Sequence, residues 1–157
     1  MKRLKTISCV LSLVGIFLLN TAYAQLHEVA FEELDSLLLQ QDKNIVVFIH
    51  TDWCKFCKKM EATTFNNDSV ITLLNEQFYF VKVNGETKKD IRFRNRTFSF
   101  KPSGGSSGIH ELAEQLGTIK GQLNYPTISI VNKQNEIIFQ YGGYLDAQAL
   151  LAVLHSL

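Results

Sequence analysis

The spacing of apolar positions changes along the chain and predicts alternating helices and strands. From Glu28 to Leu39 the apolar residues recur at mostly helical spacing, which predicts an amphipathic first helix. Ile45 to Ile49 is an unbroken apolar run rich in β-branched residues, typical of a strand buried on both faces. Phe78 to Val83 has the same character, so we expect two buried strands.

Helical patterns separate and follow these strands. A helix is expected to open at Cys54 and run to about Thr64, and Asp68 is expected to cap another through Leu74. In the second half of the chain, a helix is expected from His110 to Leu116. Thr127 to Val131 and Ile137 to Tyr141 are expected to form a hairpin. A last helix is expected from Ala147 to Leu154, capped by Asp146. The fold class is therefore α/β, with a mixed sheet covered by helices on both faces.

Residues 85–108 interrupt this order. Alternating apolar and polar residues around Asn95 predict a small hairpin, and the Gly/Ser-rich stretch 102–108 predicts a flexible tether. Three arginines lie among phenylalanines here and suggest a docking surface for a partner. A hairpin with one face on the core and the other in solvent explains the same pattern more simply.

The N-terminus has the pattern of an export signal. Basic residues precede an apolar stretch from Ile7 to Leu19, and Ala22-Tyr23-Ala24 offers a small-residue cleavage site. The apolar stretch is shorter than the roughly 20 residues of a membrane-spanning helix. We therefore expect a signal peptide at 1–24, removed on export to the periplasm or another extracytoplasmic site, and one domain at 25–157.

Charge and cysteine content limit the classes of function that the chain can have. The full chain has a formal net charge of +1, and residues 25–157 carry 13 basic and 15 acidic residues, a net charge of −2. Such a balance gives no electrostatic reason to expect nucleic acid as a partner. Cys9 would leave with the signal, so Cys54 and Cys57 remain. A disulfide closing so short a loop stabilises a fold little, which points to a chemical role for the pair.

The two cysteines lie where the first strand gives way to a helix. Cys54 is expected at the first helical turn, where unpaired N–H groups and the helix dipole favour a thiolate, so we predict it as an exposed nucleophile. Cys57 lies about one turn on, close enough for a reversible disulfide. Lys55, Lys58 and Lys59 add positive charge nearby, and Asp52 opposes them.

The segment from Thr51 to Lys58, with Trp-Cys-x-x-Cys-Lys after the first strand and Tyr125-Pro126 before the third, resembles the thioredoxin superfamily. Together with Glu61 and Thr64-Phe65, it is most similar to small exported thioredoxin-like proteins and to the C-terminal domain of the membrane thiol:disulfide interchange protein. The resemblance implies a thioredoxin fold and a cis peptide bond at Pro126 beside the cysteine pair. It also implies that the backbone of Tyr125 can pair with a substrate strand.

The resemblance has one gap. Members of the family carry a buried aspartate six residues before the first cysteine, where this chain has Phe48. Glu61, four residues after Cys57, is a candidate replacement for proton transfer, although a solvated helix carboxylate explains it equally well. His50 also titrates in a useful range, but a packed side chain is its simpler interpretation.

These features favour an extracytoplasmic thiol:disulfide oxidoreductase with Cys54 and Cys57 as catalytic residues. Trp53 is expected to flank the sulfur, and Lys55 and Phe56 to tune the potential. Expected partners are protein or peptide thiols and disulfides, with a membrane electron donor as a further candidate. No cofactor is expected, and the chain is expected to act as a monomer. The alternative is a soft-metal carrier that binds copper or zinc through the cysteines and His50. A redox-inert binding domain would not need the cysteines.

Overall fold

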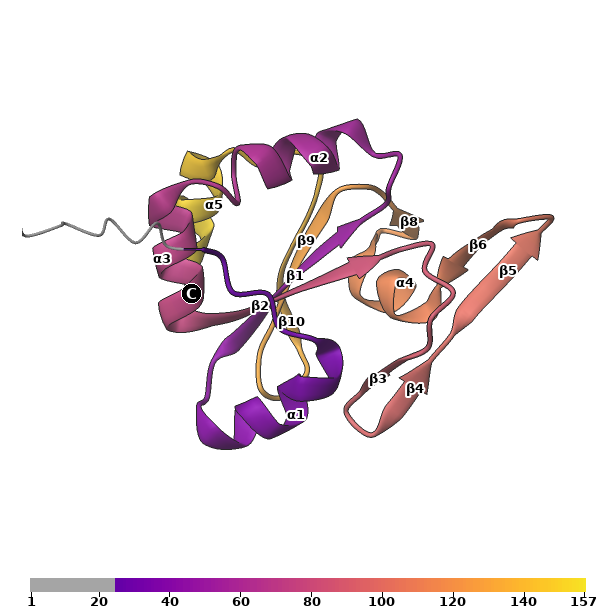
Figure 1. Ribbon diagram of the computed structural model, residues 1–157, viewed down its shortest axis with the longest axis horizontal. Helices are drawn as coiled ribbons and strands as arrows, with labels where there is room; N and C mark the ends of the chain where they lie inside the picture. Colours follow the sequence, from indigo (N-terminus) through magenta and orange to yellow (C-terminus); the bar gives the residue numbers. More distant parts are fainter. Residues whose placement is uncertain (1–24) are drawn as a thin grey trace, which may run out of the picture.

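The computed structural model describes residues 25–157, which form one mixed four-stranded sheet with helices on both faces (Figure 1). The strand order is β10-β9-β1-β2; β1 and β2 are parallel, and β9 is antiparallel to both of its neighbours. The bounds of these strands are β1 Asn44–His50, β2 Phe78–Asn84, β9 Thr127–Val131 and β10 Ile137–Gly142. A single parallel bridge between Glu28 and Phe80 continues the sheet beyond β2.

Within residues 25–157, five helices cover the sheet. Their bounds are α1 Phe31–Gln40, α2 Lys55–Ala62, α3 Asp68–Gln77, α4 Glu111–Gly117 and α5 Ala147–Leu154. Side chains from α2, α3 and α5 share one buried cluster with one face of the sheet, and side chains from α1 and α4 share another with the opposite face. The fold class predicted from the sequence is confirmed.

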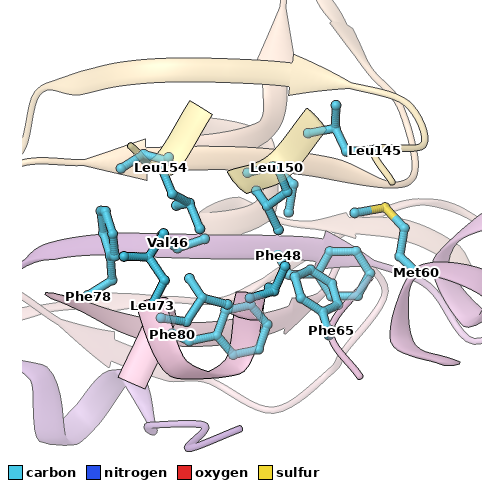
Figure 2. Close-up of a cluster of buried hydrophobic side chains, with 14 of the residues drawn as sticks. Val46, Phe48, Met60, Phe65, Leu73, Phe78, Phe80, Leu145, Leu150 and Leu154 are labelled. Atoms are coloured by element: carbon cyan, nitrogen blue, oxygen red, sulfur yellow. The ribbon is translucent and has the colours of Figure 1, made fainter. Parts of the chain in front are cut away.

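The alternation of side chains along β1 divides the core. Val46 and Phe48 point to the cluster under α2, α3 and α5, while Ile45, Val47 and Ile49 point to the cluster under α1 and α4. All five are 1% exposed or less, as the unbroken apolar run predicted. Figure 2 shows the first cluster, in which Val46 and Phe48 lie among side chains of helices on that face.

The element boundaries differ from the sequence prediction at several helix starts, including those of α1 and α3. The first helix begins at Phe31, because Ala30 is still in extended backbone and the preceding residue, Val29, donates its N–H to the Phe80 carbonyl at 2.8 Å. The cap of α3 is Asn67, whose side-chain oxygen accepts from the N–H groups of Ser69 and Val70. Asp68 is the first helical residue instead, where its charge still favours the helix dipole.

The predicted hairpin around Asn95 is confirmed. Its strands are β3 Ile91–Phe93 and β4 Arg96–Phe98, and both turn residues, Arg94 and Asn95, have positive φ. Phe93 and Phe98 are each 6% exposed and belong to the core cluster with α1, so one face of this hairpin is buried.

The prediction of a flexible Gly/Ser tether is wrong. Residues 100–110 form a second hairpin, with strands β5 Phe100–Gly104 and β6 Ser107–His110. Gly104 and Gly105 supply the positive φ angles of its turn. A short third pair, β7 Thr118–Ile119 and β8 Gln122–Leu123, follows α4 and was not predicted.

The predicted signal peptide, residues 1–24, lies outside the described residues and stays a prediction. Between residues 25 and 157, no helix combines the length and apolar character needed to cross a membrane.

Candidate active site

The cysteine pair lies where β1 leads into α2. The backbone turns after His50, and the N–H of Cys54 donates to the Thr51 carbonyl at 3.2 Å. Cys54 then acts as the N-cap of α2: its Sγ accepts the N–H of Cys57 at 3.0 Å. The first sulfur thus faces the unpaired N–H groups of a helix start, as the strand-to-helix pattern predicted.

Cys54 and Cys57 form a disulfide, with Cα atoms 5.2 Å apart. Cys54 is 4% exposed and Cys57 1% exposed, so the expectation of an exposed first sulfur is not met in this oxidised state. The reason is geometric, because Sγ of Cys54 turns towards the first turn of α2 and both cysteines belong to the core cluster that includes Met60.

Two aromatic side chains beside the disulfide are exposed instead. Trp53 is 63% exposed and Phe56 is 60% exposed. The Trp53 indole N–H donates to the Glu86 carboxylate at 3.1 Å, and its ring meets Tyr125 edge-on with centroids 5.9 Å apart. The orientation of Trp53 is therefore fixed by Glu86, in the segment after β2, and by Tyr125.

Tyr125 and Pro126 lie next to this tryptophan, and the peptide bond between them is cis. The Tyr125 ring packs against Gly85, where an added Cβ would lie 2.1 Å from the tyrosine oxygen. Burial, with a smaller contribution from the Glu86 charge, raises the pKa of Tyr125 to about 12. The phenol therefore stays protonated at any physiological pH. At position 85, only glycine leaves room for the Tyr125 ring.

The position of the missing family aspartate is filled by packed aromatic rings. Phe48 is fully buried, meets Phe65 with centroids 4.8 Å apart, and stacks with the imidazole of His50 at 5.4 Å. Burial and the nearby Lys82 charge lower the pKa of His50. This histidine is therefore a packed, neutral side chain at neutral pH.

Lys82 lies beside Phe48 on the neighbouring strand and binds two carboxylates. Its Nζ is 2.8 Å from Glu61 and 3.5 Å from Glu28. Burial lowers the pKa of Lys82, but the hydrogen bond to Glu61 and the charges of both glutamates outweigh it, so the pKa is raised overall. Glu61 is thus an ion-paired carboxylate between α2 and β2, and not a freely solvated one.

The remaining sequence candidates are spread over the surface of α2. Lys55 is exposed at its first turn, and Phe56 approaches the Tyr144 ring at 6.4 Å, while Lys59 lies 4.5 Å above the same ring. Residues 25–157 contain no group of three or more His, Cys, Asp or Glu side chains placed to hold a metal ion. The soft-metal alternative therefore lacks a third ligand in the described part of the chain.

Sequence reasoning missed Glu86, Gly85 and Lys82. Each contributes through a contact across the fold, namely the Trp53 hydrogen bond, the space beneath Tyr125 and the ion pair with Glu61. The register between β1 and β2 places Lys82 beside Phe48, whereas the contacts of Gly85 and Glu86 depend on how the segment after β2 packs against Tyr125 and Trp53.

A protein-family model described as a thioredoxin-like domain matches residues 31–157. The chain belongs to this thioredoxin-like family. The match spans every element that builds the site, from β1 to the strand that follows Pro126, so the Cys54–Cys57 pair is the CxxC pair of a thioredoxin-like domain. No curated protein sequence matches the chain.

Solved structures share the fold at low sequence identity. A structure described as "DsbH Oxidoreductase" has a TM-score of 0.61 and 16% identity, covering 99% of this chain and 92% of that one. A thioredoxin from Thermus thermophilus has a TM-score of 0.59 and 20% identity, with 84% and 86% covered. The reduced C-terminal domain of DsbD from Neisseria meningitidis has a TM-score of 0.52 and 19% identity, with 80% and 90% covered. At such identities the likeness concerns the fold alone.

Proposed function

We propose that this thioredoxin-like protein is a thiol:disulfide oxidoreductase that acts on protein or peptide disulfides outside the cytoplasm. The observation that carries the proposal is the placement of Cys54 as the N-cap of α2, with its sulfur 3.0 Å from the N–H of Cys57 and bonded to the second sulfur. One structure of similar fold is described as an oxidoreductase, which adds support.

In the reduced protein, the helix start favours a Cys54 thiolate. That thiolate attacks one sulfur of a partner disulfide, and the partner's other sulfur leaves as a thiolate. The Cys57 thiolate then attacks Cys54 in the mixed disulfide and releases the second partner sulfur. Two electrons have passed to the partner, and the Cys54–Cys57 disulfide is restored. A reductant, for which a membrane electron donor is a candidate, resets the pair.

Cys57→Ser tests this sequence of steps directly. The variant retains the attacking sulfur and lacks the resolving one, so partners should accumulate as mixed disulfides on Cys54. They would be detected in cells as bands that collapse on reduction, with the Cys54→Ser/Cys57→Ser double variant as control. Absence of any adduct with the single variant contradicts the mechanism.

Glu61 is the group we propose for proton transfer at Cys57, because it lies one helical turn beyond that residue and is held by Lys82. Glu61→Gln should shift the pH profile of disulfide exchange while leaving the disulfide able to form. Glu76→Gln, an exposed carboxylate on α3, is the matched control and should have no effect. Superimposable profiles for wild type and Glu61→Gln would remove Glu61 from the mechanism.

Export remains part of the proposal and rests on the sequence of residues 1–24. Cell fractionation with N-terminal sequencing of the purified protein tests it: a mature N-terminus at Gln25 in an extracytoplasmic fraction is expected. A cytoplasmic protein that retains Met1 contradicts it.

A further inference from the structure

The second hairpin of the insertion, β5 and β6, projects from the domain as an arm (Figure 1). Its residues 101–107 are all exposed, yet β5 and β6 form a paired ladder despite the Gly/Ser-rich composition. The ring of Phe100 lies across Gly108 on the partner strand, where a Cβ would come within 2.4 Å of the ring. Lys88 lies 5.9 Å from the same ring. The arm is therefore held by a cross-strand aromatic contact and not by burial in the core.

The two outer edges of the arm are not equivalent. His110 donates its N–H to the Gly85 carbonyl at 2.8 Å and not to Phe100, its ladder partner, so these two are a non-hydrogen-bonded pair. Pairs alternate along an antiparallel ladder, which makes Pro102 and Gly108 a non-hydrogen-bonded pair as well. Their backbone nitrogens therefore point outwards, and the proline on β5 has no N–H to offer.

At the pair formed by Pro102 and Gly108, the edge of β6 offers an N–H that the edge of β5 lacks. The Gly108 N–H and C=O point away from β5, and within residues 25–157 no third strand pairs with this hairpin. The residues beside Gly108 towards the tip, Ser106 and Ser107, are small, so another backbone can approach closely. The edge of β5 thus lacks an N–H donor at Pro102, although the Phe100 backbone also points outwards there, whereas the edge of β6 offers both backbone groups of Gly108 to an added strand.

The base of the open edge is anchored to the segment that borders the candidate active site. At its inner end, His110 contacts Gly85, which packs beneath Tyr125 and donates its own N–H to the His50 carbonyl at 2.8 Å. The next residue, Glu86, holds the exposed Trp53 beside the disulfide. The base of β6 is therefore tied, through the buried residues His110 and Gly85, to the segment that holds Trp53 beside the disulfide.

We propose that an extended segment of the protein substrate pairs with the open edge of β6 while a disulfide of the same substrate reacts at Cys54. This inference rests on the proposed function and names its substrate class: polypeptide disulfides with an extended flanking segment. A small disulfide has no backbone to pair with the arm and reacts independently of it. The arm thus gives selectivity between polypeptides and small disulfides.

The test is a variant with a shortened arm. Residues 102–108 are replaced by Asn-Gly, so that a two-residue turn joins Lys101 to Ile109, which are already ladder partners. Reduction of insulin and of 5,5′-dithiobis(2-nitrobenzoate) is compared with wild type. We expect kcat/KM for insulin to fall roughly fivefold or more, since backbone hydrogen bonds are lost, with the rate for the small disulfide unchanged. Equal kcat/KM for insulin would overturn the inference and leave the proposed function standing. Inactivity of the wild type on both substrates would instead overturn the proposed function.

A second experiment locates the contact without removing the arm. A photo-reactive residue is placed at Ser107, beside the open edge, or at Ser103 on β5 as the matched control, both in the Cys57→Ser background. A cysteine-containing peptide of the insulin B chain is trapped on Cys54. Cross-linking from position 107 and not from 103 supports the inference, whereas equal cross-linking, or none, overturns it. A dimer in light scattering that the shortened arm abolishes would also overturn it, since a second copy would then occupy the edge.

Discussion

The two hairpins of the insertion are neighbours in sequence and similar in size, yet they are stabilised in different ways. The β3–β4 hairpin places Phe93 and Phe98 in the core, where Phe93 meets Phe31 edge-on at 5.5 Å. The β5–β6 arm relies on Phe100 lying over Gly108 and on the contact between His110 and Gly85. The first hairpin is therefore part of the folded core, whereas the second is attached to the core at its base and depends on its own cross-strand contacts.

The largest effect is expected from the core hairpin. Phe98→Ala removes a buried ring and should lower the free energy of unfolding by about 3 kcal/mol, the lower end for such a truncation, because Arg96 covers the ring and the hairpin can partly collapse. Urea unfolding measures this, with the exposed neighbour Thr97→Ala as control. A loss no larger than that of the control would show that the two hairpins do not differ.

A smaller, pH-dependent effect is expected at His110, the fully buried residue where the arm joins α4. Its Nδ1 accepts the N–H of Leu112, and burial lowers its pKa, although the Lys89 and Phe98 carbonyls and nearby acidic charges oppose the shift. Folding therefore favours neutral His110. Its contribution is complete above about pH 6.5 and is lost as pH falls through the lowered pKa of the folded state.

His110→Asn keeps a capping side chain and cannot be protonated in this range. The loss of stability between pH 7 and pH 5 should be shallower in this variant than in wild type, as measured by unfolding at a series of pH values. Some slope should remain, because burial also lowers the pKa of His50. An unchanged slope would show that His110 does not link the arm's base to pH.

The smallest global effect is expected in the arm itself. Phe100→Ala uncovers Gly108 without opening the core, so the free energy of unfolding should change by less than about 1 kcal/mol. Amide hydrogen exchange across residues 100–110 should nevertheless become faster, because the ladder opens locally. A loss as large as that of Phe98→Ala would mean that the arm is part of the cooperative core.

The insertion also shows how far the sequence can be interpreted. The alternating pattern and Asn95 predicted the first hairpin correctly, because its register follows from which residues are buried. The second was predicted as a tether, since Ser, Gly and Pro carry no period. Its order comes from the contact between Phe100 and Gly108. The sequence contains no pattern that indicates this contact between two residues.

The candidate site divides in the same way. The cysteine spacing and the strand-to-helix change were enough to predict that Cys54 lies at the start of a helix, because both are local, although Cys54 is the N-cap and not a residue of the first turn. Two other contacts depend on β2 lying beside β1. They are the ion pair of Glu61 with Lys82 and the hydrogen bond from Trp53 to Glu86. The shielding of Cys54 in the disulfide depends on packing under α2, which periodicity alone does not reveal.

Pro102 has a consequence for the behaviour of this protein at high concentration. A two-stranded ribbon with both edges open can pair with a second molecule at each edge, and repeated pairing builds a fibre of unlimited length. Here Pro102 removes one outward N–H from the β5 side, which weakens the pairing of a second ribbon there, although the Phe100 backbone also points outwards on that side. The missing donor at Pro102 therefore lowers the tendency of such ribbons to stack edge to edge into fibres.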